Sequence, residues 1–123
     1  MSEHDPQVCE RFHRAIELIG RRWSGSVLYV LLQRDVLRFC EIREAIPDIS
    51  DRLLTERLKE LEDAALVVRT VTNARPVLVT YGLTGTGREL GPILDALAEW
   101  ASRWDETPSL RDGAAAAVPP TRP

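Results

Sequence analysis

The spacing of the apolar residues changes once in the middle of this 123-residue chain, near residue 66. Before that point four apolar residues recur at steps of three and four, which places them within about 40° of one another on a helix. Beyond it, Val67–Thr72 and Val77–Tyr81 are rich in valine and threonine, as strands are, and residues 73–76 separate them. A helix followed directly by a two-stranded hairpin is therefore expected. The four apolar residues of the helix are Leu54, Leu58, Leu61 and Ala65.

A shorter helix and a tight turn come immediately before this long helix. The segment Phe39–Ala45 carries its apolar side chains on one side, and residues 47–49 then interrupt the helical pattern. Ser50 is expected to cap the long helix, and the acidic Asp51 in its first turn favours the positive end of the helix dipole. Two helices joined by so short a turn form a helix-turn-helix, and a hairpin directly after the second helix is the layout of a winged helix.

Two further helical segments are expected on the N-terminal side. Residues 9–19 carry apolar side chains at helical spacing, and Gly20 is a natural C-terminal stop. Ser24 is expected to cap a second segment that runs to about Leu32 and is apolar on nearly every face. That segment fits either a central helix or a buried strand, because its length does not decide between them.

The last helical segment is expected at residues 84–104. Its apolar residues form a seam close to heptad spacing, and Pro92 interrupts the seam, so the helix either starts after Gly91 or kinks there. The glycines of residues 82–87 are expected to form a turn. One domain is therefore expected at residues 9–104, with a flexible N-terminus at residues 1–8 and a disordered, proline-rich tail at residues 105–123.

Composition fits one globular domain, with 44% hydrophobic and 28% charged residues. The formal net charge of −3 argues weakly against a nucleic-acid binder when taken alone. The charge is unevenly distributed, however, because residues 20–80 hold ten basic and nine acidic side chains and the remainder holds six basic and ten acidic ones. The question is then which face the central arginines occupy.

Several function classes find no support in the sequence. No glycine-rich phosphate loop follows a strand, and neither a nucleophile elbow nor a metalloprotease signature is present, so no enzyme and no cofactor are expected. The longest apolar run, Val27–Leu32, is far shorter than the ~20 residues that cross a bilayer. Acidic residues crowd the first ten positions, which disfavours a secretory leader. With only two cysteines, the chain suits a reducing compartment, and a cytoplasmic location is expected.

Five stretches of the chain, in order over residues 9–104, are similar to the HxlR-type, MarR-like winged helix-turn-helix transcriptional regulators. The chain departs from the usual pattern of that family at three positions: Glu10 follows Cys9 where proline is common, and Cys40 and Gly82 stand where serine is common. The stretches that carry the resemblance are Ala15–Trp23, Arg38–Ile42, Ile49–Glu62, Tyr81–Thr84 and Leu94–Trp100.

The resemblance implies a mainly α fold with a small β-hairpin wing and with dimerisation helices at the N- and C-termini. It also implies a bacterial homodimer that binds double-stranded DNA at a palindromic operator. The residues then expected in the dimer interface are Phe12, Ile16, Ile93, Leu97, Trp100 and Trp104.

A winged helix offers DNA the face of its second helix that turns away from the apolar stripe. On that face Arg52 is the best candidate for a guanine edge. Glu56 is a candidate to accept from a cytosine amine, and the alternative is that it pairs with Lys59 or with a neighbour of Glu60. Thr55 is expected at a thymine methyl or a phosphate. The same residues also fit an ordinary solvated helix face. The full set of expected DNA contacts is Arg38, Ser50, Arg52, Thr55, Glu56, Lys59 and the wing-tip Arg75; a structural or phosphate role is expected for Arg57.

Cys9 is a candidate redox sensor. It lies at the start of a helix with Arg11, His13 and Arg14 close in sequence, and these surroundings favour the thiolate. The alternative for Cys9 is an inert buried thiol, which is the ordinary role of a lone cysteine. Cys40 is a candidate resolving partner across the dimer. A metal site is less expected, because Cys9, His13 and Cys40 lack a recognised ligand spacing. An oxidant, a small-molecule inducer or neither remain open as the signal.

The sequence therefore predicts a sequence-specific DNA-binding transcriptional regulator. The alternative is a winged helix that serves as a protein-interaction or assembly module without DNA binding, which the acidic overall charge would suit.

Overall fold

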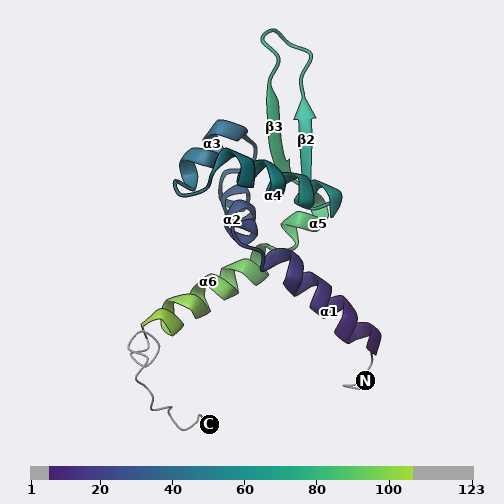
Figure 1. Ribbon diagram of the computed structural model, residues 1–123, viewed down its shortest axis with the longest axis vertical. Helices are drawn as coiled ribbons and strands as arrows, with labels where there is room; N and C mark the ends of the chain where they lie inside the picture. Colours follow the sequence, from purple (N-terminus) through teal and green to yellow (C-terminus); the bar gives the residue numbers. More distant parts are fainter. Residues whose placement is uncertain (1–5, 107–123) are drawn as a thin grey trace. The chain divides into compact units, whose positions relative to one another are not determined.

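The computed structural model describes residues 6–106, with side chains from residue 10 onward. Figure 1 shows a helical body from which a long β-hairpin projects. The expected mainly α fold with a wing is confirmed. The described chain forms two compact units, the first ending at Gly91 and the second beginning at Pro92. In chain order the elements are α1 (Pro6–Ile19), α2 (Ser24–Arg34), β1 (Leu37–Arg38), α3 (Phe39–Ala45), α4 (Asp51–Asp63), β2 (Val67–Val71), β3 (Val79–Leu83), α5 (Gly85–Arg88) and α6 (Gly91–Asp105).

The core of the first unit lies between α2, α3, α4 and the base of the hairpin. The apolar segment that fitted a helix or a strand is the helix α2, and it is the central one. Burying each of its leucines contributes about 1.5–3 kcal/mol, so this core fixes α3 and α4 against α2. The apolar side chains that are almost fully buried there are Val27, Leu28, Leu31, Ile42, Leu54, Leu58 and Leu61.

The sheet has three antiparallel strands in the order β1-β3-β2, whereas two strands were expected. The additional strand β1 is only two residues long, and it pairs Leu37 with Tyr81 and Arg38 with Thr80. The hairpin itself runs in register from Val67 opposite Leu83 to Val71 opposite Val79. Because β1 leads directly into α3, its pairing ties the helix-turn-helix to the base of the wing.

The expected starts of the first two helices are corrected by the structure. α1 begins at Pro6, three residues before the expected start. Ser24 is not a cap but the first residue of α2; it is buried, and its hydroxyl has no hydrogen-bond partner among the described residues. The capping position belongs to Trp23, whose left-handed φ of 78° reverses the chain and whose side chain makes no capping bond.

Two expectations around the hairpin are also corrected. Ala65 is exposed and lies beyond the end of α4, with a left-handed φ of 64°, so the apolar stripe continues through the buried Leu66 instead. The glycines of residues 82–87 do not form a simple turn, because Gly82 lies within β3 and residues 85–88 form α5. Gly87 packs so closely on Leu66 that an added Cβ would lie 2.3 Å from the Leu66 carbonyl oxygen.

Of the two alternatives for the C-terminal helix, the structure supports a start at Gly91 rather than a kink there, and a separate short helix, α5, precedes it. α5 ends at Arg88, and α6 begins at Gly91 with Pro92 in its first turn, where the missing N–H of proline does no harm. No described helix has the length and apolarity needed to cross a membrane. Of the expected flexible N-terminus, residues 1–5 lie outside the described part of the chain, as do residues 107–123 of the expected tail.

Candidate nucleic-acid interface

The start of α4 is built as a capped helix N-terminus. Ser50 has an extended backbone, and its Oγ accepts a hydrogen bond from the Leu53 N–H at 3.1 Å. Leu54, Leu58 and Leu61 then hold the opposite side of α4 in the core. The N-terminal polar face of α4 is therefore left exposed by the packing of the helix itself.

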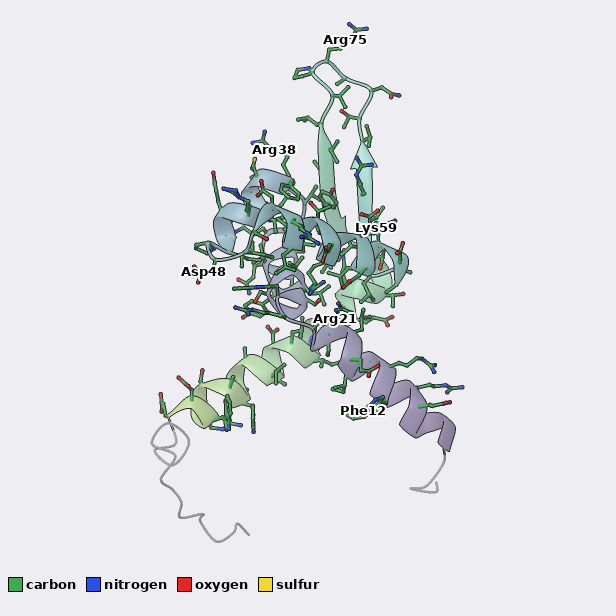
Figure 2. All side chains as sticks on the ribbon, in the orientation of Figure 1. Phe12, Arg21, Arg38, Asp48, Lys59 and Arg75 are labelled. Carbon is green, nitrogen blue, oxygen red and sulfur yellow. The ribbon has the colours of Figure 1, made fainter. Side chains whose placement is uncertain are left out.

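The exposed face of α4 carries alternating charges that pair with one another. Arg52 Nε lies 3.3 Å from Glu56 Oε2, and the Arg52 side chain is 89% exposed. One turn further on, Lys59 Nζ lies 3.9 Å from Asp63 Oδ1, and Figure 2 marks Lys59 on α4. The expected alternative in which Glu56 pairs with Lys59 is wrong, because Glu56 pairs with Arg52 and Lys59 pairs with Asp63. Arg52, Glu56 and Lys59 lie together on one accessible surface, as expected.

Thr55 lies on the same surface, but its hydroxyl is engaged. Its Oγ1 donates to the Asp51 carbonyl oxygen at 2.8 Å, a bond back to the preceding turn of the helix. The hydroxyl hydrogen is therefore not available to a phosphate, and the methyl group is the part left for an outside contact. This arrangement favours the thymine methyl over the phosphate as the partner of Thr55.

α3 supplies a second group of arginines beside α4. Arg38 precedes α3, and its backbone N–H donates to Glu41 Oε1 at 2.8 Å. This bond holds the pKa of the Glu41 carboxyl below its ordinary value, and the Arg38 side chain 3.5 Å away adds to the effect. Arg43 reaches across the turn to Asp51, with 2.9 Å between its Nη1 and Oδ1. Arg43 was not among the expected DNA contacts. Its position in the last turn of α3, directly before the turn to α4, is the sequence feature that could have indicated that it lies beside α4.

The tip of the wing presents Arg75. Figure 2 shows Arg75 at the far end of the hairpin, and the side chain is exposed. Two bonds between Thr72 and Leu78 close the loop below it: the Thr72 N–H donates to the Leu78 carbonyl at 2.9 Å, and the Leu78 N–H donates to Thr72 Oγ1 at 3.1 Å. The tip is thus held at a defined end of the sheet.

Arg57 occupies a different environment from the other arginines of α4. Its side chain is only 9% exposed, and its Nε donates to the Arg22 carbonyl oxygen at 2.9 Å. Of the two roles expected for Arg57, this geometry supports the structural one. Its partner lies 35 residues away along the chain, so no local sequence pattern could indicate this bond.

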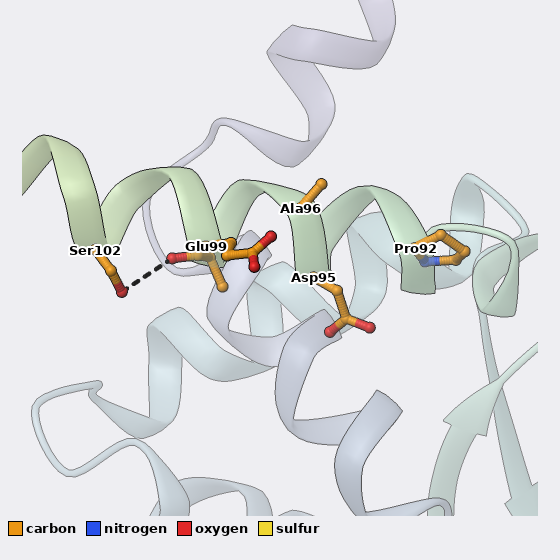
Figure 3. A pocket seen from close by; sticks show the side chains of 6 residues that line it. Pro92, Asp95, Ala96, Glu99 and Ser102 are labelled. Atoms are coloured by element: carbon orange, nitrogen blue, oxygen red, sulfur yellow. Dashed lines mark hydrogen bonds between the residues drawn. The ribbon is translucent and has the colours of Figure 1, made fainter.

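Apolar side chains are exposed on α1 and, in the second unit, on α6. On α1, Phe12 is 67% and Ile16 is 47% exposed. On α6 the seam residues share one face, and the rings of Trp100 and Trp104 stack with 5.4 Å between their centroids. Figure 3 shows the other face of α6, which carries polar side chains that include Asp95, Glu99 and Ser102. The exposed apolar side chains of α6 are Ile93, Leu97, Trp100 and Trp104.

The two cysteines differ in what the structure describes. Cys40 is a free, exposed thiol on α3, at a surface hollow of about 220 Å³ that Arg43 and Asp51 also line. The side chain of Cys9 lies outside the described part of the chain, so the expected pairing with Cys40 stays a prediction. Among the described residues, no group of three or more His, Cys, Asp or Glu side chains is placed to hold a metal ion.

The chain is similar in sequence to a family of known proteins. The profile of the HxlR-like helix-turn-helix family matches residues 18–109. The chain is 41% identical over 106 residues to the uncharacterised HTH-type transcriptional regulator YvaP of Bacillus subtilis, covering 86% of this chain and 96% of YvaP.

Two regulators of known structure are similar as well. The reduced form of YodB from B. subtilis matches with a TM-score of 0.71 and 41% identity, over 78% of this chain and 93% of YodB. The oxidised form of the redox regulator HypR matches with a TM-score of 0.70 and 35% identity, over 76% of this chain and 95% of HypR. YodB has also been solved after diamide treatment and with quinone bound.

Proposed function

The chain belongs to the HxlR-like helix-turn-helix family of transcriptional regulators, and we propose that it acts on a palindromic operator as a homodimer. The observation that carries this proposal is the exposed N-terminal face of α4, with Arg52, Thr55 and Glu56 turned away from the core. Such a face fits the major groove, which is about 12 Å wide and admits an α-helix.

Each residue of the interface has a proposed role. Arg52 contacts a guanine edge, Thr55 a thymine methyl, and Glu56 a cytosine amine. Ser50 and Arg38 contact phosphates, because they lie at the N-termini of α4 and α3, and Lys59 adds a basic contact further along α4. Arg75 enters the neighbouring minor groove, whose negative potential attracts arginine.

Dimerisation supplies the second recognition helix. The apolar side chains exposed on α1 and α6, which are Phe12, Ile16, Ile93, Leu97, Trp100 and Trp104, are the proposed contact with a second copy of the chain. Aromatic residues are enriched at such interfaces, and the stacked Trp100 and Trp104 would form its centre.

We further propose control by a thiol oxidant through Cys9, with Cys40 as a candidate partner in the second copy. Similarity to YodB and to the redox regulator HypR supports this signal. Peroxide or diamide treatment should change the mass and the operator affinity of the wild type but not of Cys9→Ser. Equal affinity in both proteins after oxidation would exclude thiol control and leave a small-molecule inducer as the alternative.

Footprinting of the region upstream of the protein's own gene tests the proposed operator. We expect two protected half-sites one helical turn apart, about 10–10.5 bp between centres, or a multiple of it. Binding should weaken steeply as salt rises, because phosphate contacts release counterions. The absence of a protected palindrome at both low and physiological salt would contradict the proposal. Binding to a protein partner without salt dependence would point to the alternative of an interaction module.

A further inference from the structure

Arg57 joins the recognition helix α4 to the turn between α1 and α2. Its Nε donates to the Arg22 carbonyl oxygen at 2.9 Å. That turn lies between α1 and α2, so its backbone carbonyls have no helical partner and have to be satisfied by other groups. The Arg21 carbonyl is used by the Ser24 N–H at 3.0 Å, and the Arg22 carbonyl is used by Arg57.

The guanidinium of Arg57 also continues a series of ion pairs along α4. Its Nη1 lies 3.2 Å from Glu60 Oε2 and 3.9 Å from Glu56 Oε1. Glu60 in turn lies 3.4 Å from Arg21 Nε. At the other end of the series, Glu56 pairs with Arg52, the proposed guanine contact, at 3.3 Å. Arg52 is thus connected through Glu56 and Arg57 to the turn between α1 and α2.

Packing alone does not explain an arginine at this position. Arg57 borders the stripe of Leu54, Leu58 and Leu61, where an apolar side chain would bury its surface without a desolvation cost. A buried ion pair is weak evidence for stability, and its better attested role is to fix one arrangement among several. The bond to a backbone carbonyl is directional, so it adds to the leucine contacts a further limit on how α4 turns about its own axis.

We propose that Arg57 is a positioning residue for DNA recognition. It holds α4, and with it the Arg52–Glu56 pair, in a fixed orientation relative to the α1–α2 turn, so that a displacement of α1 is transmitted to the base-contacting face. The inference rests on the proposed function and deepens it, because α1 carries Cys9 and part of the proposed dimer contact.

Three variants test this role. Arg57→Met keeps an unbranched stem and removes the charge and the donors, and Arg57→Lys restores one charged donor. Arg21→Met is the matched control, because it removes the exposed partner of Glu60 but leaves the bond to Arg22 in place. Each protein is measured by fluorescence anisotropy on the footprinted operator and on random DNA over a range of salt. Hydrogen exchange then reports on the amides of residues 20–24.

We expect Arg57→Met to lose about tenfold or more in operator affinity, with affinity for random DNA changed by less than about twofold. The salt dependence of binding should stay unchanged, because Arg57 touches no phosphate. Exchange at residues 20–24 should rise while α2 and α4 remain protected. Arg57→Lys should recover part of the operator affinity, and Arg21→Met should stay close to wild type.

Other outcomes overturn the role. Unchanged operator affinity in Arg57→Met would make the contact structural only, and so would an equal loss on both DNAs with a smaller folded fraction. If Arg57→Met does not fold, the same measurements on Arg57→Leu decide, since a folded Leu variant also lacks the donor to the Arg22 carbonyl, and wild-type affinity in it overturns the proposal. A salt slope lower by about one phosphate contact would mean that Arg57 binds DNA directly. If the wild-type protein binds no operator, the proposed function itself is overturned. If the wild type binds its operator and Arg57→Met binds it equally well, only the positioning role of Arg57 is overturned.

Discussion

The Nε of Arg52 lies 3.3 Å from the Oε2 of Glu56 on the exposed face of α4. The pair spans one helical turn, and an exposed pair of this spacing contributes only about 0.3–0.5 kcal/mol. DNA can therefore separate the two side chains at little cost. In the proposed complex the carboxylate would become available to a base once the arginine has moved to its own.

Arg52→Ala should lower operator affinity by about 1–3 kcal/mol, the value of a bidentate contact between arginine and guanine. The variant should lose its preference for G·C over other base pairs at a single position in each half-site. Titration of the variant against operators altered one base pair at a time measures this. If the variant kept the full affinity and base preference of the wild type, Arg52 would have no part in base recognition.

Glu56→Gln should reduce the preference for the operator over random DNA. Removing this carboxylate takes away a repulsion from phosphates, so affinity for random DNA should rise by on the order of 0.2–1 kcal/mol. A cytosine-specific acceptor is weakened at the same time. Competition assays measure the ratio, and Glu10→Gln, with the same charge change on α1, is the control. An unchanged ratio in Glu56→Gln would place Glu56 outside the interface.

The helix-turn-helix was predictable because its signals are local. The spacing of Leu54, Leu58 and Leu61 fixes which side of α4 is buried, and Ser50 caps the helix through a residue three positions away. These two local features are sufficient to predict that Arg52 lies on the exposed face of α4. Local signals did not predict β1, because a strand of two residues is too short to show a period. They also misplaced the cap of α2 at Ser24, because the N-cap is Trp23, whose backbone is left-handed.

The pairings within the interface were not predictable from the sequence. Glu56 has basic neighbours on both sides, and only the side-chain geometry selects Arg52 as its partner at 3.3 Å and Arg57 as a more distant one at 3.9 Å. The contact between Arg57 and the Arg22 carbonyl depends on how α4 packs beside the α1–α2 turn. Such a contact is a property of tertiary structure, which single-sequence patterns do not report.

Ser50→Ala should destabilise the fold by about 0.5–2 kcal/mol, because the Leu53 N–H loses its acceptor at the N-terminus of α4. Urea denaturation of both proteins measures the change in the free energy of unfolding. Ser26→Ala, at an exposed position within α2, serves as the control and should stay within about 0.5 kcal/mol of wild type. Equal stability of the two variants would show that the cap contributes nothing.

Stability should depend on pH through Glu41. The bond from the Arg38 N–H lowers the folded-state pKa of this carboxyl below its ordinary value of 4.5. The stabilisation is therefore fully present above the pKa of the unfolded state and is lost as the pH falls through the lower, folded-state pKa. The gap in unfolding free energy between wild type and Glu41→Gln should shrink as the pH falls below 4.5. A gap that stays constant on acidification would contradict the assignment.

Trp100→Glu should convert the proposed dimer into monomers, because the substitution places a charge in the middle of the apolar face of α6. Trp100 is 48% exposed and stacks on Trp104, so the change leaves the core of the first unit untouched. Asp95→Lys is the matched control on the polar face shown in Figure 3, and it should remain dimeric. Sedimentation velocity measures both proteins.

Operator binding by the same two variants separates dimerisation from recognition. The Trp100→Glu monomer keeps α4 and the wing intact, so its affinity for an isolated half-site should match that of the wild-type protein. Its affinity for the full palindrome should fall to about the half-site value, because the second contact is no longer gained at a high effective concentration. A monomer that bound the palindrome as tightly as wild type would show that one recognition helix is sufficient, and the symmetric operator would have to be abandoned.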